Sequence, residues 1–155
     1  MNHLKLLLTR PLQKVSISAA VIVLIVALVG FADSTYLTVE HYRGVIPPCT
    51  VVAGCEQVLT SAYATILGVP VALGGAVFYL LVALGAFAYI EGRHERLFRY
   101  GLALTVIGFI FTLWFLYVQA FLLKAFCQYC LVSAVTSTLL FVMAVYIFKR
   151  YRATL

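Results

Sequence analysis

Four long apolar runs decide what this chain can fold into. Charged residues bound these runs, except that the second starts near Pro70, and each run is close to the roughly 20 residues that a helix needs to cross a hydrocarbon core of about 30 Å. Because no water is present there to bond the backbone, such segments form helices. The sequence therefore predicts an all-α membrane protein in which one domain, 1–155, is a four-transmembrane-helix bundle. The helices are expected at about residues 15–37, 69–90, 100–123 and 126–148.

Composition excludes an ordinary soluble domain. Hydrophobic residues make up 65% of the chain and charged residues 10%, against roughly 45–50% and about 25% in globular proteins. The net charge of +6 comes from short basic clusters between the apolar runs and not from a basic patch with interleaved aromatic residues. We therefore expect contact with membrane lipid and no nucleic-acid binding.

The distribution of basic residues predicts the orientation of the bundle. Nine of the eleven Lys and Arg residues lie in the N-terminal tail, in the connection over 91–99 and in the C-terminal tail. The positive-inside rule then places both termini in the cytoplasm. The first run is longer than the core of a cleaved signal peptide, so we expect it to remain as a membrane helix.

The first outward connection is long and begins where Asp33 marks the outer edge of the first apolar run. Pro47 and Pro48 interrupt any helix there. The segment that follows, 55–64, carries apolar residues at helical spacing. It predicts a short amphipathic helix in this first extracytoplasmic loop.

All four cysteines fall on the outward, oxidising side. Cys49 and Cys55 lie in the long connection, whereas Cys127 and Cys130 form a CxxC at the start of the fourth helix. A helix start stabilises a thiolate, which is the reacting form of cysteine. Three interpretations stay open from spacing alone: thiol–disulfide exchange, structural disulfides, and a metal site that uses all four sulfurs.

A redox CxxC at membrane depth needs an electron acceptor. The chain has no CxxCH haem motif and no nucleotide-binding glycine motif, so a quinone in an apolar pocket beside Cys130 is the remaining acceptor. Gln119, near the outer end of the third helix, is interpreted as a hydrogen bond within the bundle. Aromatic candidates for the pocket are Phe78, Tyr79, Phe111, Trp114 and Phe115.

The layout of these motifs resembles the bacterial branch of the vitamin K epoxide reductase (VKOR) family. The resemblance covers about residues 15–148 and has the stand-alone form, without a fused thioredoxin-like domain. It rests on Cys49-x5-Cys55, Ser61, Gly68-Val69-Pro70, Phe78-Tyr79 and Cys127-x2-Cys130.

The resemblance implies a role for each of these residues. Cys130 would be the nucleophile nearest the quinone, and Cys127 would exchange with Cys55, while Cys49 would face an incoming protein dithiol. The quinone, menaquinone or ubiquinone, would be bordered by Ser61, Leu59, Phe78 and Phe115. No metal is implied.

The implied activity is a quinone-dependent thiol oxidase that reoxidises a DsbA-like thioredoxin-fold protein and so supports disulfide formation. It would work in the bacterial inner membrane with its cysteines on the periplasmic side, and we expect the partner to be a separate protein. Val71 and Ala134 stand where vertebrate members have Asn and Tyr, which argues against epoxide reduction. The alternatives are a DsbB-type oxidase, whose two cysteine pairs come in the reverse order, and a non-enzymatic membrane scaffold with structural disulfides.

Overall fold

The computed structural model describes residues 15–52, 54–92 and 94–152, with the side chains of 151 and 152 left out. Both chain ends lie outside the described residues, including the N-terminal tail with its three basic residues. Arg93 lies outside them as well.

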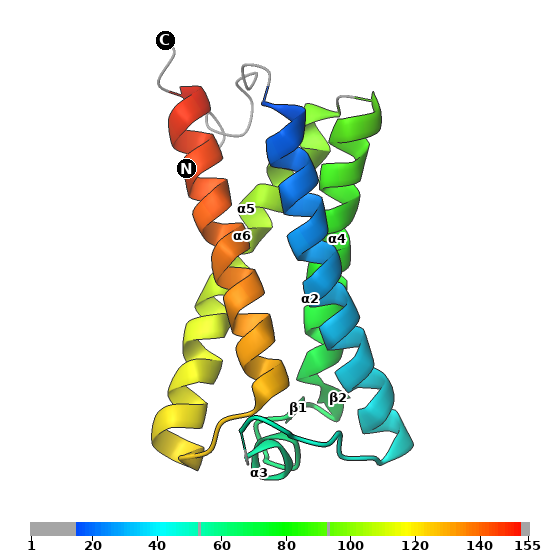
Figure 1. Ribbon diagram of the computed structural model, residues 1–155, viewed down its shortest axis with the longest axis vertical. Helices are drawn as coiled ribbons and strands as arrows, with labels where there is room; N and C mark the ends of the chain where they lie inside the picture. Colours follow the sequence, from blue (N-terminus) through cyan, green and yellow to red (C-terminus); the bar gives the residue numbers. More distant parts are fainter. Residues whose placement is uncertain (1–14, 53, 93, 153–155) are drawn as a thin grey trace.

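Four helices in the described residues are long and apolar enough to cross a membrane, which confirms the predicted fold class. α4 and α5 are joined at one end of the bundle, where α6 also finishes (Figure 1). α5 runs into a π-helical segment, η1, and a short connection around Lys124 leads to α6. The bounds are α2 Ile17–Arg43, α4 Val71–Gly92, α5 Glu95–Tyr117, η1 Val118–Leu123 and α6 Gln128–Arg152.

The outer surface of the bundle is apolar, as expected for a protein whose solvent is lipid. Every long helix turns large hydrophobic side chains outward, and about half of the surface of each is exposed. Such a continuous apolar surface would be untenable in water. One example from each helix is Ile25 at 56%, Phe87 at 50%, Ile110 at 60% and Val142 at 56%.

α2 extends further than the sequence predicted. The polar residues from Asp33 onward indicated an end near residue 37, whereas the helix continues to Arg43 and stops at Gly44 in the left-handed conformation, φ 67°. Its polar side chains are accommodated inside the bundle, where Ser34 is 3% exposed and the Thr38 hydroxyl donates to the Ser34 carbonyl at 2.7 Å. Asp33 thus lies inside α2, and the helix continues beyond it to Arg43.

The loop between α2 and α4 forms a small layer across one end of the bundle. It contains the short helix α3, Cys55–Leu59, and an antiparallel pair of strands, β1 Thr65–Ile66 and β2 Val69–Pro70. α3 confirms the predicted short helix, although it ends earlier than expected, at Leu59. The strand pair was not predicted; its turn needs positive φ at Leu67, 52°, and Gly68, 80°.

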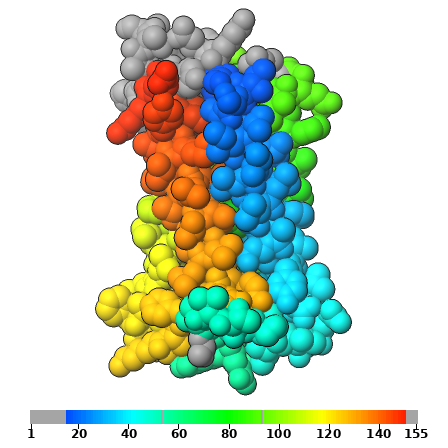
Figure 2. Space-filling view, in the orientation of Figure 1, coloured from blue at the N-terminus to red at the C-terminus, as the bar shows by residue number. Residues whose placement is uncertain are grey.

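This layer covers the end of the bundle at which α6 begins. In Figure 2 the teal atoms of the loop lie against the orange atoms of α6. Four of the described basic residues, Arg96, Arg99, Lys149 and Arg150, belong to the opposite end, near the α4–α5 connection and the last turns of α6 (Figure 1). Arg43 and Lys124 lie at the end that carries the cysteines. The two ends of the molecule therefore differ in both charge and cysteine content.

Candidate functional site

Cys49 and Cys55 form a disulfide that ties the loop to the start of α3. Their Cα atoms are 5.9 Å apart, within the normal range for a bridged pair. Cys49 is half-buried, whereas Cys55 is only 3% exposed. The Cys49 sulfur is therefore the more accessible of the two to another protein.

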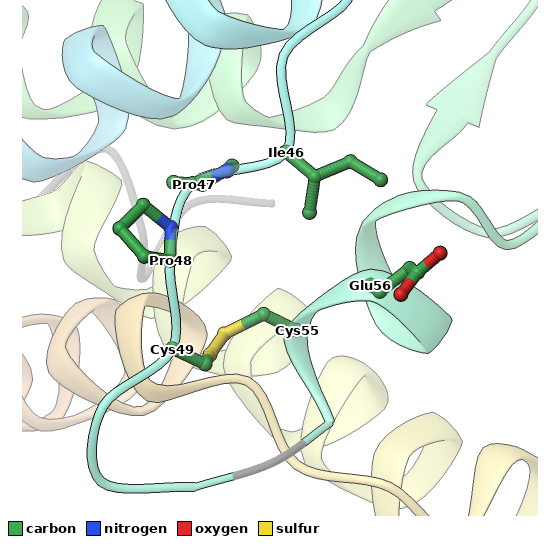
Figure 3. Close-up of a pocket in the computed structure, with 6 residues that line it drawn as sticks. All are labelled: Ile46, Pro47, Pro48, Cys49, Cys55 and Glu56. Carbon is green, nitrogen blue, oxygen red and sulfur yellow. A yellow bond between two sulfur atoms is a disulfide. The ribbon is translucent and has the colours of Figure 1, made fainter.

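A shallow hollow of about 390 Å³ opens beside this disulfide. In Figure 3 the extended chain through the two prolines leads to Cys49, and the bridge joins it to the first residue of α3. The Glu56 side chain points away from the sulfurs. The hollow is lined by Ile46, Pro47, Pro48, Cys49, Cys55 and Glu56.

Cys127 and Cys130 are free thiols at the start of α6. The Cys127 carbonyl accepts the hydrogen bond of the Leu131 N–H at 3.0 Å, so Cys127 occupies the cap position and Cys130 lies in the first turn. Cys127 has no exposed surface, while Cys130 is partly exposed. The two sulfurs of the CxxC therefore have different surroundings.

The four cysteines are brought into one packed cluster, although up to 81 positions separate them in the chain (49 to 130). Cys55 and Cys127 are in its buried centre together with Val58 and Ala125. Cys49 and Cys130 pack against that centre from its edges. The arrangement places the buried member of the disulfide with the buried member of the CxxC.

The pKa of the Cys127 thiol is lowered to about 7. The largest cause is a hydrogen bond with the Cys130 side chain, and the backbone N–H groups of Cys130 and Tyr129 add to it. Burial and the negative charge of Asp33 act in the opposite direction. The helix start thus favours the reactive thiolate at Cys127 even though the group is buried.

A large cavity lies on the other side of the CxxC, between α2, α4, α5 and the loop. Its volume is about 970 Å³ and its wall is mostly apolar. Cys130 lines this cavity and Cys127 does not. All four residues proposed for the quinone pocket, Ser61, Leu59, Phe78 and Phe115, also line it.

Over residues 21–145 the chain matches the family model of the vitamin K epoxide reductase family. The chain belongs to this family. No curated protein matches it. VKOR proteins are oxidoreductases whose general reaction links thiol–disulfide exchange to a quinone, and the family normally works with a thioredoxin-like partner. The four apolar helices fit a multipass membrane protein of this family.

The cavity fits the quinone that VKOR chemistry requires. A quinone ring needs flat apolar contacts and a few polar groups at its edge, and the aromatic side chains Phe78, Phe111 and Phe115 share the wall with Ser61 and the Cys130 thiol. The Ser61 hydroxyl donates its own hydrogen to the Val58 carbonyl at 2.7 Å, which leaves the oxygen as an acceptor. Quinone held here would lie beside the Cys130 sulfur.

Two of the aromatic candidates behave differently from the expectation. Tyr79 lines the cavity, but its hydroxyl is engaged by α6, donating to the Ser133 carbonyl at 2.8 Å and lying 2.8 Å from the Thr136 hydroxyl. Trp114 is not part of the wall, and half of its surface faces outward. Its assignment to the pocket was wrong. Successive residues of a helix point about 100° apart, so Trp114 does not share the face on which Phe115 lines the cavity.

Sequence reasoning did not foresee which groups the polar side chains around the CxxC would bond. Gln119, interpreted as a hydrogen bond within the bundle, is 2% exposed and accepts the backbone N–H of Cys127. Gln128 and Tyr129, the two central residues of the CxxC, bond the backbone of the disulfide loop. Only the polarity of Gln119 inside an apolar run signalled such a role in advance.

A metal site was the remaining interpretation of the four sulfurs. Over the described ranges, no group of three or more His, Cys, Asp or Glu side chains is placed to hold a metal ion. Two of the sulfurs are bonded to each other, and a disulfide offers no thiolate ligand. The structure holds one disulfide, Cys49–Cys55, packed beside the free thiols of Cys127 and Cys130.

Proposed function

We propose that this VKOR-family protein is a quinone-dependent thiol oxidase that reoxidises a DsbA-like thioredoxin-fold protein. One observation carries the proposal: the loop disulfide and the CxxC pack in one cluster, with Cys55 and Cys127 in its buried centre. The Cys49–Cys55 bridge lines the outer hollow, and Cys130 lines the inner cavity. The cluster therefore offers a path by which electrons that enter at the loop can reach the cavity through the CxxC.

The first step uses the accessible sulfur of the disulfide. A partner thiolate attacks Cys49, an intermolecular disulfide forms, and Cys55 leaves as a thiolate. The second partner thiol then closes the partner's own disulfide and releases Cys49 as a thiol. The partner has lost two electrons, and the loop pair has gained them.

The second step moves these electrons inward. Cys55 attacks Cys127 of an oxidised CxxC, so that a Cys55–Cys127 disulfide forms and Cys130 leaves as a thiolate. Cys49 then attacks Cys55, which restores the loop disulfide and leaves Cys127 reduced. The sulfur state of the structure, with a loop disulfide and two CxxC thiols, is the state reached at this point.

The last step returns the CxxC to its disulfide. A quinone bound in the cavity supplies a two-electron, two-proton acceptor beside Cys130. Cys127 and Cys130 close their bond and give up two electrons and two protons. Of the two sulfurs, Cys130 is the one that contacts the cavity, and Cys127 has the lowered pKa that favours exchange with Cys55.

The proposed location is the bacterial inner membrane, with the cysteines on the periplasmic side and both termini in the cytoplasm. Arg96, Lys149 and Arg150 lie at the end opposite the cysteines, as the positive-inside rule requires for a cytoplasmic end. Disulfide chemistry is also favoured on the periplasmic side.

The test supplies the purified protein with reduced DsbA and a short-chain ubiquinone, and measures quinone reduction from the change in quinone absorbance. The wild type should turn over, and Cys130→Ala should lose turnover while its helix content is unchanged. Leu139→Ala, on the exposed face of α6, serves as the control. Thiol oxidation that persists in Cys130→Ala would favour the scaffold alternative.

A further inference from the structure

The two central residues of the CxxC have no part in the sulfur chemistry, yet both bond the disulfide loop. We infer that Gln128 and Tyr129 are positioning residues that hold the Cys49–Cys55 loop against the CxxC, so that Cys55 and no other loop atom meets Cys127. The inference rests on the proposed function, because it explains how the loop is held in place for the proposed exchange between Cys55 and Cys127.

The oxygen and the nitrogen of the Gln128 side-chain amide both form hydrogen bonds with the backbone of the loop. Its Oε1 accepts the N–H groups of Thr50 and Val51, each at 3.1 Å, and its Nε2 donates to the Pro48 carbonyl at 3.4 Å. The reversed amide would set N–H against N–H, so the network decides the orientation of the group. One side chain thereby spans the segment that carries Cys49.

Tyr129 adds a second donor to the same segment. Its hydroxyl donates to the Pro48 carbonyl at 3.1 Å, and its ring centroid lies 5.5 Å from that of Tyr36 on α2. Pro47 and Pro48 have no N–H group and cannot form a regular ladder of their own. The extended segment before Cys49 therefore depends on donors from α6.

The helical spacing of the CxxC explains why one short motif can do both tasks. Successive residues of a helix point about 100° apart, so positions three apart share a face while the two between them do not. Cys127 and Cys130 turn toward the sulfur cluster and the cavity. Gln128 and Tyr129 turn toward the loop that covers the start of α6.

The other half of the loop is held independently. Gln57 Nε2 donates to the Leu123 carbonyl at 2.9 Å, and Gly54 lies directly on the backbone of Phe126. These contacts fix the Cys55 half, whereas the Cys49 half is restrained by the disulfide and by the bonds from Gln128 and Tyr129. When the loop disulfide is reduced during turnover, the bonds from Gln128 and Tyr129 remain. All three Gln128 bonds are solvent-exposed, which suits a contact that opens when the partner docks.

The test compares Gln128→Met, which keeps the side-chain length and removes the bonds, with Tyr129→Phe and with the control Tyr42→Phe. Tyr42 is 66% exposed at the last turn of α2 and lies outside the loop contact. With reduced DsbA and a short-chain ubiquinone, Gln128→Met should slow turnover about tenfold and Tyr129→Phe by about threefold. Tyr42→Phe should match the wild type.

A second background separates positioning from damage to the CxxC. In Cys49→Ser/Cys55→Ser, dithiothreitol can reduce only the CxxC, and Gln128→Met should leave this quinone reduction unchanged. A loss of rate here would overturn the inference, because Gln128 would then act on the CxxC itself. Wild-type turnover by Gln128→Met with DsbA would overturn it as well.

A readout without turnover keeps the inference apart from the proposed function. Hydrogen exchange at the amides of Thr50 and Val51 should be faster in Gln128→Met than in Tyr42→Phe. If the wild type reduces no quinone in any assay, the proposed function fails, while this exchange still reports whether Gln128 holds the loop. Unchanged exchange in Gln128→Met would refute the positioning contact.

Discussion

The backbone N–H of Cys127 donates a 2.9 Å hydrogen bond to Oε1 of Gln119, a side chain that is 2% exposed. Gln119 also accepts the Ala125 N–H at its backbone carbonyl, 3.1 Å away. It lies in the π-helical turn η1, a type of distortion often found at functional sites. One residue at the end of the third transmembrane helix therefore fixes the chain just before the fourth.

Removing this acceptor should weaken the protein and loosen the CxxC. Gln119→Leu leaves the buried Cys127 N–H without a partner, which costs about 1–3 kcal/mol. Denaturant unfolding in detergent micelles measures the loss. Gln57→Leu is the matched control, because the carbonyl it bonds is exposed to solvent; an equal loss in both variants would argue against a special role for Gln119.

The shared burial of Cys55 and Cys127 predicts which sulfurs bond across the two pairs. Cys49→Ser/Cys130→Ser leaves only these two cysteines, and mild oxidation should join them rapidly. Cys55→Ser/Cys127→Ser leaves the two edge cysteines, which should join slowly. Non-reducing electrophoresis and peptide mass spectrometry identify the bond, and the opposite order of rates would contradict the relay.

Thiolate formation at Cys127 should follow its lowered pKa. With a pKa of about 7 in the reduced protein, the thiolate fraction is half at about pH 7, falls below that pH and is nearly complete at pH values well above it. Ultraviolet thiolate absorbance of the reduced protein follows this titration. Because the Cys130 hydrogen bond is the largest cause of the shift, Cys130→Ala should move the midpoint to higher pH.

The contact between Gly54 and the segment before the CxxC has no room for a side chain. A Cβ at this position would lie 2.6 Å from the Phe126 carbonyl oxygen and 2.8 Å from its nitrogen. Gly54→Ala should cost about 1–3 kcal/mol and slow quinone reduction with reduced DsbA. Gly101→Ala, where the nearest atom would be 3.5 Å away, should change neither quantity.

The wall of the inner cavity should govern the affinity for quinone. Phe115→Ala removes one aromatic face from the cavity wall and should raise KM for a short-chain ubiquinone by about tenfold, the effect of losing one aromatic contact. Phe87→Ala, on the lipid-facing surface, is the control. Steady-state kinetics at varied quinone concentration distinguish a rise in KM from a fall in kcat. Equal KM values in Phe115→Ala and Phe87→Ala would exclude Phe115 from the quinone site.

Hydropathy alone determined the four helices, because a bilayer permits little else for 20 apolar residues. It misjudged the end of α2, since Ser34 and Thr38 are polar in sequence but buried against neighbouring helices. The strand pair at Thr65–Pro70 escaped prediction because two residues per strand carry no periodicity. Interior polarity and very short elements are therefore where sequence patterns carried too little information.

The sequence by itself also predicted that the two cysteine pairs lie on one side of the bundle, because charge and hydropathy assign every connection to a side. Only the tertiary structure decided that Cys55 and Cys127 share one buried cluster while Cys130 lines the cavity. Those relationships depend on the fold of the loop over α6 and on the rotation of α6 about its axis. Both are set by contacts between residues far apart in the chain, such as Gln128 with Thr50, which no local pattern encodes.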